Sequence, residues 1–256
     1  MKIIDLSVNI ENNSISDPPP LRANIEYMSH SETATEMTTF FEGVTVDDLP
    51  KGLGWAVEQV QLCTHSGTHL DAPWHYHPTM NNGEKALTID EVPLEWCIGN
   101  GVVVDFSEKP DGYLVVSEDF KNAFARMNYV YAKNDIILVY TGASKKYGTA
   151  KYLVSGCGMG REATLWLIEQ GMRVCGTDAW SWDRPLPIIG KEFARTKDKN
   201  IIWEGHYAGI EKMYCHYEKL TNLDKLPKTG FQFIGLPVKV AGAGGAWVRA
   251  VAMVND

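Results

Sequence analysis

The chain has 256 residues, of which 45% are hydrophobic and 22% charged, so it is long enough to bury one large core. Its formal net charge of -8 argues against binding to nucleic acid or to anionic membranes, because both require a basic protein surface. No run approaches the ~20 apolar residues that a membrane span needs. Five cysteines without a Cys-x-x-Cys pair predict neither a disulfide framework nor a thiolate zinc site. We therefore expect a cytoplasmic protein that acts on a small molecule.

Strand and helix signals alternate along the chain, which predicts one α/β domain over residues 1–256. Residues 11–36, with three successive prolines, are expected to form a long excursion outside the core. A helix is expected to start at Ser117 as its cap, and a second one to cover 161–170 and stop at Gly171. The expected strands, in chain order, are 2–10, 101–106, 135–140, 172–177, 231–240 and 247–254.

Residues 64–78, THSGTHLDAPWHYHP, contain four of the seven histidines of the chain. Glycine, β-branched threonine and an internal proline all destabilise a helix, so a strand, extended or bent, is the better prediction. Alternate residues of a strand share a face, and His77 lies off the face that the other donors share. The donors on that shared face are His65, His69, Asp71 and His75.

A straight strand would separate His65 from His75 by ~33 Å, at ~3.3 Å per residue. The donors of one metal ion lie only ~2.0 to 2.2 Å from it. We therefore expect the segment to bend, and Gly67 and Pro73 are the residues that allow a bend. The missing side chain of Gly67 would also leave room for an ion or a substrate.

The run from His65 to His75 matches His-x-Gly-Thr-His-x-Asp-x-Pro-x-His at every position. It resembles the signature of the metal-dependent cyclase family, which includes bacterial kynurenine formamidases and isatin hydrolases. Further segments at 3–10, 137–142, 176–183 and 218–227 also resemble that family, so the resemblance covers most of the chain. It implies an α/β fold of the swivelling β/β/α type, with a mixed sheet and flanking helices. It also implies amide hydrolysis with Zn²⁺ or Mn²⁺ in a homodimer or homotetramer whose protomers help to build one another's sites.

By this resemblance, His65, His69 and Asp71 are expected to be the primary metal ligands, and His75 the general acid or base. Imidazole and carboxylate donors without thiolate suit Zn²⁺, Mn²⁺ or Fe²⁺ and leave positions open for water. A bound ion lowers the pKa of water from ~15.7 to about 7, so metal-bound hydroxide can attack a carbonyl near neutral pH. The leaving nitrogen needs a proton, which a histidine beside the ion can deliver.

Two downstream residues resemble the distal histidine and glutamate of the family, which complete the metal site or bind a second ion. They are His206, in EGHYAGIEK, and Glu218, in CHYEKLTNLDKLP. His206 is favoured by its spacing to Glu218, while His216 is the alternative because it stands beside that segment. Glu218 is also the next candidate, after His75, for the catalytic proton transfer.

Aromatic side chains in the segments expected around the metal suit a flat substrate ring. The candidates for substrate binding are Phe41, Trp55, Trp74 and Trp180. Residues 140–148, YTGASKKYG, lack the arginine before and the tryptophan after the Thr-Gly pair that many members carry. This difference and the extended segment 24–55 favour a cyclic amide such as isatin over N-formylkynurenine.

Three other interpretations stay open. Residues 155–178 imitate a dinucleotide-binding fingerprint, with glycines at 156, 158 and 160 and Asp178 about twenty residues on, but the third glycine is one position early. The same ion could instead serve a lyase or a true cyclisation. Finally, the chain could be a metal-binding module without turnover, although such a module would not need His75 as a base.

Overall fold

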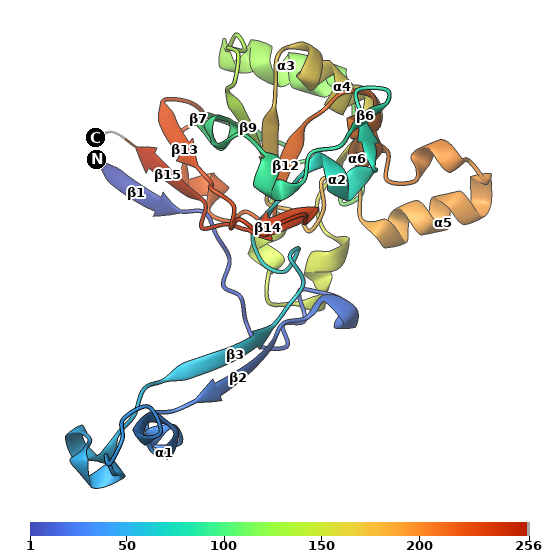
Figure 1. Cartoon of the computed structure of the whole chain (residues 1–256). Helices are drawn as coiled ribbons and strands as arrows, with labels where there is room; N and C mark the ends of the chain where they lie inside the picture. Colours follow the sequence, from blue (N-terminus) through green and yellow to red (C-terminus); the bar gives the residue numbers. More distant parts are fainter. Residues whose placement is uncertain (255–256) are drawn as a thin grey trace.

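Within residues 1–254, which this computed structural model describes, nine strands form one curled mixed sheet (Figure 1). The four central strands run parallel, and the strands on either side of them are antiparallel. In sheet order they are β1 (Lys2–Asp5), β15 (Val251–Val254), β13 (Phe231–Ile234), β7 (Ile98–Asp105), β9 (Ile136–Tyr140), β11 (Val174–Thr177), β12 (Cys215–Glu218), β4 (His69–Asp71) and β14 (Gly245–Trp247). The parallel centre is thus buried, and antiparallel strands extend it at both edges.

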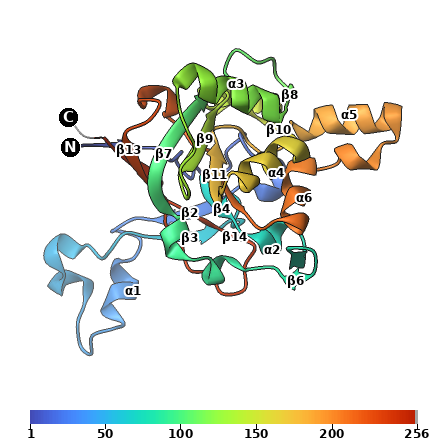
Figure 2. The ribbon, with the colours of Figure 1, turned by 90° about the horizontal axis from the view of Figure 1, so that it is seen from above.

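Six α-helices accompany the sheet in the described part of the chain: α1 (Ala34–Thr38), α2 (Pro73–Tyr76), α3 (Ser117–Met127), α4 (Arg161–Glu169), α5 (Leu186–Thr196) and α6 (Glu204–Glu211). Figure 2 shows α3 and α4 together outside the curled sheet. Helix α4 packs against α3 and α6, and α6 packs against α2. Three strand pairs lie outside the sheet: β2 (Asn24–Met28) with β3 (Val57–Gln61), β5 (Thr79–Met80) with β6 (Glu84–Lys85), and β8 (Leu114–Val115) with β10 (Gly158–Met159).

Strand β9 and the second half of β7 are continuous apolar runs, as expected for strands that are buried on both faces. Val102 and Val104 of β7 pack in the core under α3, with Phe120, whereas Val103 packs in the core on the other face, with Phe233. The alternation of strands and helices therefore gives one sheet with an apolar layer on each of its two faces. Leu70 of β4 and Tyr217 of β12 pack in the same layer as Val103.

The predicted mixed sheet with flanking helices is confirmed, as are the strands at 101–106 and 135–140 and the helix before Gly171. The first strand is shorter than expected and ends at Asp5. Ser117 does not cap α3: its backbone N–H donates to Glu162 at 2.7 Å. Asp119 accepts from the N–H of Val116, the true cap position, at 3.1 Å. Ser117 is therefore the first residue of α3 and not its cap.

Two parts project from the body on different sides in both views (Figure 2). One is the arm, residues 24–61, in which β2 and β3 pair from Asn24 opposite Gln61 and α1 lies beyond their far end. The other is α5 with the short turn after it. The predicted excursion thus leaves the core and includes the first strand of the arm. None of the helices within 1–254 has the length and apolar character to cross a membrane.

Candidate metal centre

The histidine-rich segment is a turn, a strand and a helix in succession. Gly67 has a positive φ of 62°, and a Cβ there would lie 3.0 Å from Ile10. Pro73 is the first residue of α2, where its missing N–H costs nothing. The bend expected at Gly67 and Pro73 is confirmed, but a single strand through His75 is wrong, because proline here starts a helix instead of preventing one.

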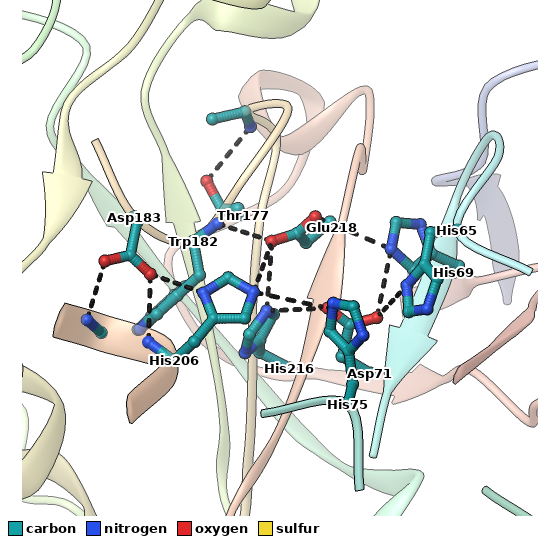
Figure 3. Close-up of polar contacts among 12 residues, drawn as sticks. His65, His69, Asp71, His75, Thr177, Trp182, Asp183, His206, His216 and Glu218 are labelled. Carbon is teal, nitrogen blue, oxygen red and sulfur yellow. Dashed lines mark hydrogen bonds and ion pairs between the residues drawn. The ribbon is translucent and has the colours of Figure 1, made fainter. Parts of the chain in front are cut away.

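Strand β12 lies beside β4 and adds the next donors. In the antiparallel register, His216 stands opposite Asp71, and Glu218 stands opposite His69. Helix α6 brings His206 to the same place (Figure 3). The structure therefore brings together all of the expected ligands, and His216 in addition.

The carboxylate of Asp71 lies at the centre of this cluster (Figure 3). Its Oδ1 is 2.7 Å from His65 Nδ1 and 3.2 Å from His69 Nε2. Its Oδ2 is 3.2 Å from His216 Nε2 and 3.7 Å from His206 Nε2. The two oxygens of Asp71 thus face two different sets of imidazoles.

Glu218 also faces both sets. Its Oε1 is 3.1 Å from His216 Nε2 and 3.6 Å from His206 Nε2, while its Oε2 is 3.6 Å from His69 Nε2. The backbone N–H of Trp182 donates to Oε1 at 2.8 Å and fixes the carboxylate. Two groups of donors lie close enough together to hold an ion: Asp71, His206, His216 and Glu218 form one, and His65, Asp71 and His75 form the other. His69 Nε2 lies beside both, at 3.2 Å from Asp71 Oδ1 and 3.6 Å from Glu218 Oε2.

Several buried polar atoms of the cluster have no hydrogen-bond partner: His65 Nδ1, His69 Nε2 and both oxygens of Asp71. Buried polar atoms are normally hydrogen-bonded, because an unsatisfied one loses its hydration without compensation. These atoms nevertheless converge on one another, and Asp71 has 0% exposure. Imidazole and carboxylate atoms arranged in this way fit a divalent cation, which would satisfy all of them.

Three of the imidazoles are oriented by a hydrogen bond on the ring nitrogen that faces away from the carboxylates. The pairs are His69 Nδ1 with Gly67 O at 2.9 Å, His206 Nδ1 with Asp183 Oδ2 at 2.5 Å, and His216 Nδ1 with the Tyr76 hydroxyl at 2.9 Å. If each Nδ1 carries the proton, each Nε2 presents a lone pair to Asp71 and Glu218. Metal-binding histidines are held in this way in proteins.

Both carboxyl groups are ionised. Burial would raise their pKa values, but the neighbouring histidines outweigh it: the pKa of Asp71 lies well below its usual range, and that of Glu218 is lowered to about 2. Burial lowers the pKa of His206, but Asp183, Asp71 and Glu218 together outweigh burial and raise it to about 9. The two carboxylates thus favour positive charge beside them. In the absence of a metal ion, protonated imidazoles provide that charge.

Replacing Tyr76 with phenylalanine tests the support of His216. The hydroxyl lies 2.9 Å from His216 Nδ1 and donates to the carbonyl of Asp71 at 3.3 Å, so its loss frees the imidazole to rotate. We expect divalent-ion affinity to fall by roughly 10- to 100-fold, the usual effect of losing such an outer partner. Titration with Zn²⁺ against a chelating dye measures this. Tyr27→Phe on the exposed arm is the control, and equal affinities in both variants would contradict the assignment.

His75 lies at the rim of the cluster. Its Nε2 is 3.8 Å from Asp71 Oδ2, its ring stacks on His65 at 3.9 Å between centroids, and its side chain is 27% exposed. Burial lowers its pKa to about 4, and the charge of Asp71 only partly opposes this. At neutral pH the ring is therefore uncharged and can accept a proton.

A cavity of about 440 Å³ reaches the cluster, and its lining includes Trp180, Trp203, His206 and Glu218. Of the aromatic residues expected to bind substrate, Trp180 alone lines it. Trp74 is 40% exposed on α2, away from this lining. Phe41 and Trp55 belong to the arm, which projects from the body within one chain (Figure 1). Their roles in substrate binding stay predictions.

Sequence reasoning left His206 and His216 as alternatives, whereas the structure places both in the cluster. The signal for His216 was its spacing of two from Glu218, because alternate residues of a strand share a face. Asp183 and Trp203 were missed, since only the folded chain brings them to His206.

The glycine-rich segment does not have the features of a dinucleotide site. The carboxylate of Asp178 is buried and accepts hydrogen bonds from Thr141 and Ser144, so it is not free for a ribose. A Cβ on Gly158 would lie 2.0 Å from the backbone N of Arg184. This glycine is therefore required for close packing.

Comparison with known proteins agrees with the cluster. The family model described as putative cyclase matches residues 4–184, which include the whole run from His65 to His75. The chain belongs to the cyclase family. This cyclase-family protein is 25% identical to the kynurenine formamidase of Bacillus thuringiensis subsp. konkukian (strain 97-27) over 195 residues, 76% of this chain and 78% of the relative. It is 24% identical to the kynurenine formamidase of Erythrobacter litoralis (strain HTCC2594), with 76% of each chain covered.

Solved structures similar to this cyclase-family protein include two isatin hydrolases. Isatin hydrolase A from Labrenzia aggregata, bound to benzyl benzoate, superposes with a TM-score of 0.74 at 25% identity. The match covers 100% of this chain and 94% of the isatin hydrolase chain. Isatin hydrolase A from Ralstonia solanacearum has a TM-score of 0.77 at 22% identity, and the match covers 99% of this chain and 92% of that one. The second likeness concerns the fold alone.

Proposed function

We propose that this protein is a metal-dependent hydrolase that cleaves the amide bond of a small aromatic substrate. The substrate is a cyclic amide resembling isatin or, as the alternative, an aryl formamide. The observation that carries the proposal is the convergence of unpartnered buried nitrogen and oxygen atoms beside an apolar cavity. The relatives named kynurenine formamidase and isatin hydrolase support the same reaction class.

The donor set suits Zn²⁺ or Mn²⁺, since it offers imidazole and carboxylate without thiolate. In our proposal, His65, His69 and Asp71 hold one ion, and the second group adds His206, His216 and Glu218 around the other oxygen of Asp71. A bound divalent ion would supply a Lewis acid for the carbonyl and a water of lowered pKa. The protein holds the donors in place through the outer partners Asp183 and Tyr76.

His75 has the geometry of the proton carrier. It lies at the edge of the cluster, its Nε2 faces Asp71, and its ring is fixed between His65 and Trp203. An uncharged imidazole there can take a proton from water and deliver it to the leaving nitrogen. Glu218 is the next candidate for this role, although the hydrogen bond that it accepts from the N–H of Trp182 and its closeness to His216 Nε2 also suit a ligand.

Hydrolysis is tested by supplying Zn²⁺ or Mn²⁺ and following acid release from isatin and from formanilide in weakly buffered solution. We expect turnover with metal, its loss on chelation, and its recovery when metal is restored, because the ion supplies the Lewis acid. Turnover in fully metal-free protein would contradict the metal requirement. No acid from any amide in the metal-loaded protein would favour a binding module, and a product without oxygen from ¹⁸O-labelled water would favour the lyase or cyclisation alternative.

We also propose a homodimer or homotetramer formed through the arm. The arm exposes apolar side chains that the same chain leaves uncovered: Tyr27, Phe40, Phe41, Leu53 and Val60. In such an oligomer, Phe41 and Trp55 could reach a neighbouring site and act there as predicted. A cytoplasmic location is part of the same proposal and rests on five free cysteines.

Removing the arm tests this assembly. Asn24 pairs with Gln61, so the ends of the arm lie close enough to join by a short turn in place of residues 25–60. We expect the shortened chain to be a monomer by light scattering and the full chain an oligomer. An unchanged oligomer after removal would place the interface elsewhere.

A further inference from the structure

The cavity beside the metal cluster lies between α5 and α6 and has a distinct chemical character. Its side chains beyond the cluster are aliphatic or aromatic: Trp180, Leu186, Ile189, Phe193, Trp203 and Tyr207. At about 440 Å³, it is roughly three times the ~150 Å³ cavity that holds one benzene molecule. It therefore has room for more than a single aromatic ring.

Apart from His206 of the metal cluster, no described side chain that lines this cavity can carry a positive charge. Among the residues that the structure describes, no lysine or arginine side chain lines it. Arg184, just before α5, instead donates to Glu192 at 2.7 Å. A carboxylate placed among the aliphatic and aromatic side chains of α5 and α6, away from the cluster, would lose its hydration without gaining a partner. The cavity thus disfavours acidic and zwitterionic groups.

Gly190 keeps the cavity open. It lies in the middle of α5, where glycine is less favourable than alanine. It lines the cavity, and a Cβ built there would meet no other heavy atom within 4 Å. No neighbouring atom therefore requires a glycine at this position, and a larger side chain there would occupy the open space.

We propose that the substrate is an uncharged amide with an apolar substituent larger than one ring, and that this substituent binds between α5 and α6. This inference rests on the proposed function, because the scissile bond must lie at the metal cluster when the substituent fills the cavity. Helix α5 then determines specificity, with Gly190 setting the depth available. Zwitterionic N-formylkynurenine becomes a poor substrate.

Matched substrates test the proposal in metal-loaded protein. They are formanilide and 4-phenylformanilide, isatin and 5-phenylisatin, and N-formylkynurenine as the zwitterion. We expect phenyl substitution to raise kcat/KM by about tenfold or more, since even one methylene in a fitted apolar pocket contributes roughly that much. N-formylkynurenine should fall below formanilide. Equal kcat/KM with and without the phenyl group, or a preference for the zwitterion, would overturn the inference.

Two variants locate the effect. Gly190→Phe should remove the gain from the phenyl group, mainly through KM, so that kcat/KM falls more for 4-phenylformanilide and 5-phenylisatin than for formanilide and isatin. Gly190→Ala is the control: it should keep the gain and raise the melting temperature, because alanine favours the helix. If phenyl substitution still raises kcat/KM in Gly190→Phe, the substituent binds elsewhere and the proposal is overturned.

Binding to metal-free protein separates this inference from the hydrolytic function. We expect 4-phenylformanilide to bind more tightly than formanilide by calorimetry, and Gly190→Phe to abolish the difference. If that preference holds but no amide is turned over with metal, the hydrolase proposal fails and the apolar site stands. If amides are hydrolysed without any such preference, the function stands and the apolar site fails.

Discussion

Asp71→Asn is expected to abolish divalent-ion binding and to lower kcat/KM for amide hydrolysis by about 10³-fold or more, since a Lewis acid contributes several kcal/mol. The side chain has 0% exposure, and its oxygens face five imidazoles. Asparagine keeps the volume but removes the charge and turns one acceptor oxygen into a donor. Elemental analysis of the purified variant, together with its kinetics, measures both effects.

Asp224→Asn is the matched control, because that carboxylate is partly exposed and lies 3.7 Å from Lys145 on the surface. It should keep the metal content and the rate of the wild type. Circular dichroism should show both variants folded. If Asp71→Asn retains a full complement of metal, the ion has been assigned to the wrong residues.

His75→Asn is expected to keep the metal ion and to lose turnover by ~10² to 10⁴-fold, the usual contribution of general acid or base catalysis. His75 lies 3.8 Å from Asp71 Oδ2, farther than the other imidazoles of the cluster, and it is the more exposed partner in its stack with His65. The pKa of His75 is lowered to about 4 by burial, and a nearby cation would lower it further. Turnover that needs the neutral His75 ring should therefore decrease only at low pH, where the ring becomes protonated. The His75→Asn variant should not show this decrease.

His77→Asn is the control for that experiment. This neighbouring ring accepts a hydrogen bond from the N–H of Thr79 at 3.1 Å and stands apart from the cluster. Its variant should match the wild type in metal content, rate and pH profile. If purified His75→Asn contains no metal, His75 is a ligand. If the variant has normal turnover and a normal pH profile, the role in proton transfer belongs to Glu218 instead.

The local part of the site could be predicted from the sequence. His65, His69 and Asp71 lie within seven residues, and Gly67 is the residue at which a bend is possible, so their convergence depends on short-range geometry. The continuous apolar runs also predicted β7 and β9, two of the four central strands, because strands buried on both faces are apolar throughout.

The distal part could not be predicted in this way. His216 reaches Asp71 because β12 is the neighbour of β4 in the sheet, and strand order depends on contacts between residues far apart in the chain. The cavity likewise arises where α5 meets α6. The aromatic residues of the arm were assigned by nearness in sequence, whereas the antiparallel pairing of β2 with β3 carries them away from the body.

The most direct test of the metal cluster is a crystal structure of the Mn²⁺- or Zn²⁺-loaded protein with anomalous data collected at the absorption edge of the metal. We predict an anomalous peak within ~2.0 to 2.2 Å of His65, His69 and Asp71, and a second beside Asp71, His206, His216 and Glu218 at sufficient metal. Full activity in crystals or solution with no anomalous peak at these residues, or with the ion bound elsewhere, would contradict the account.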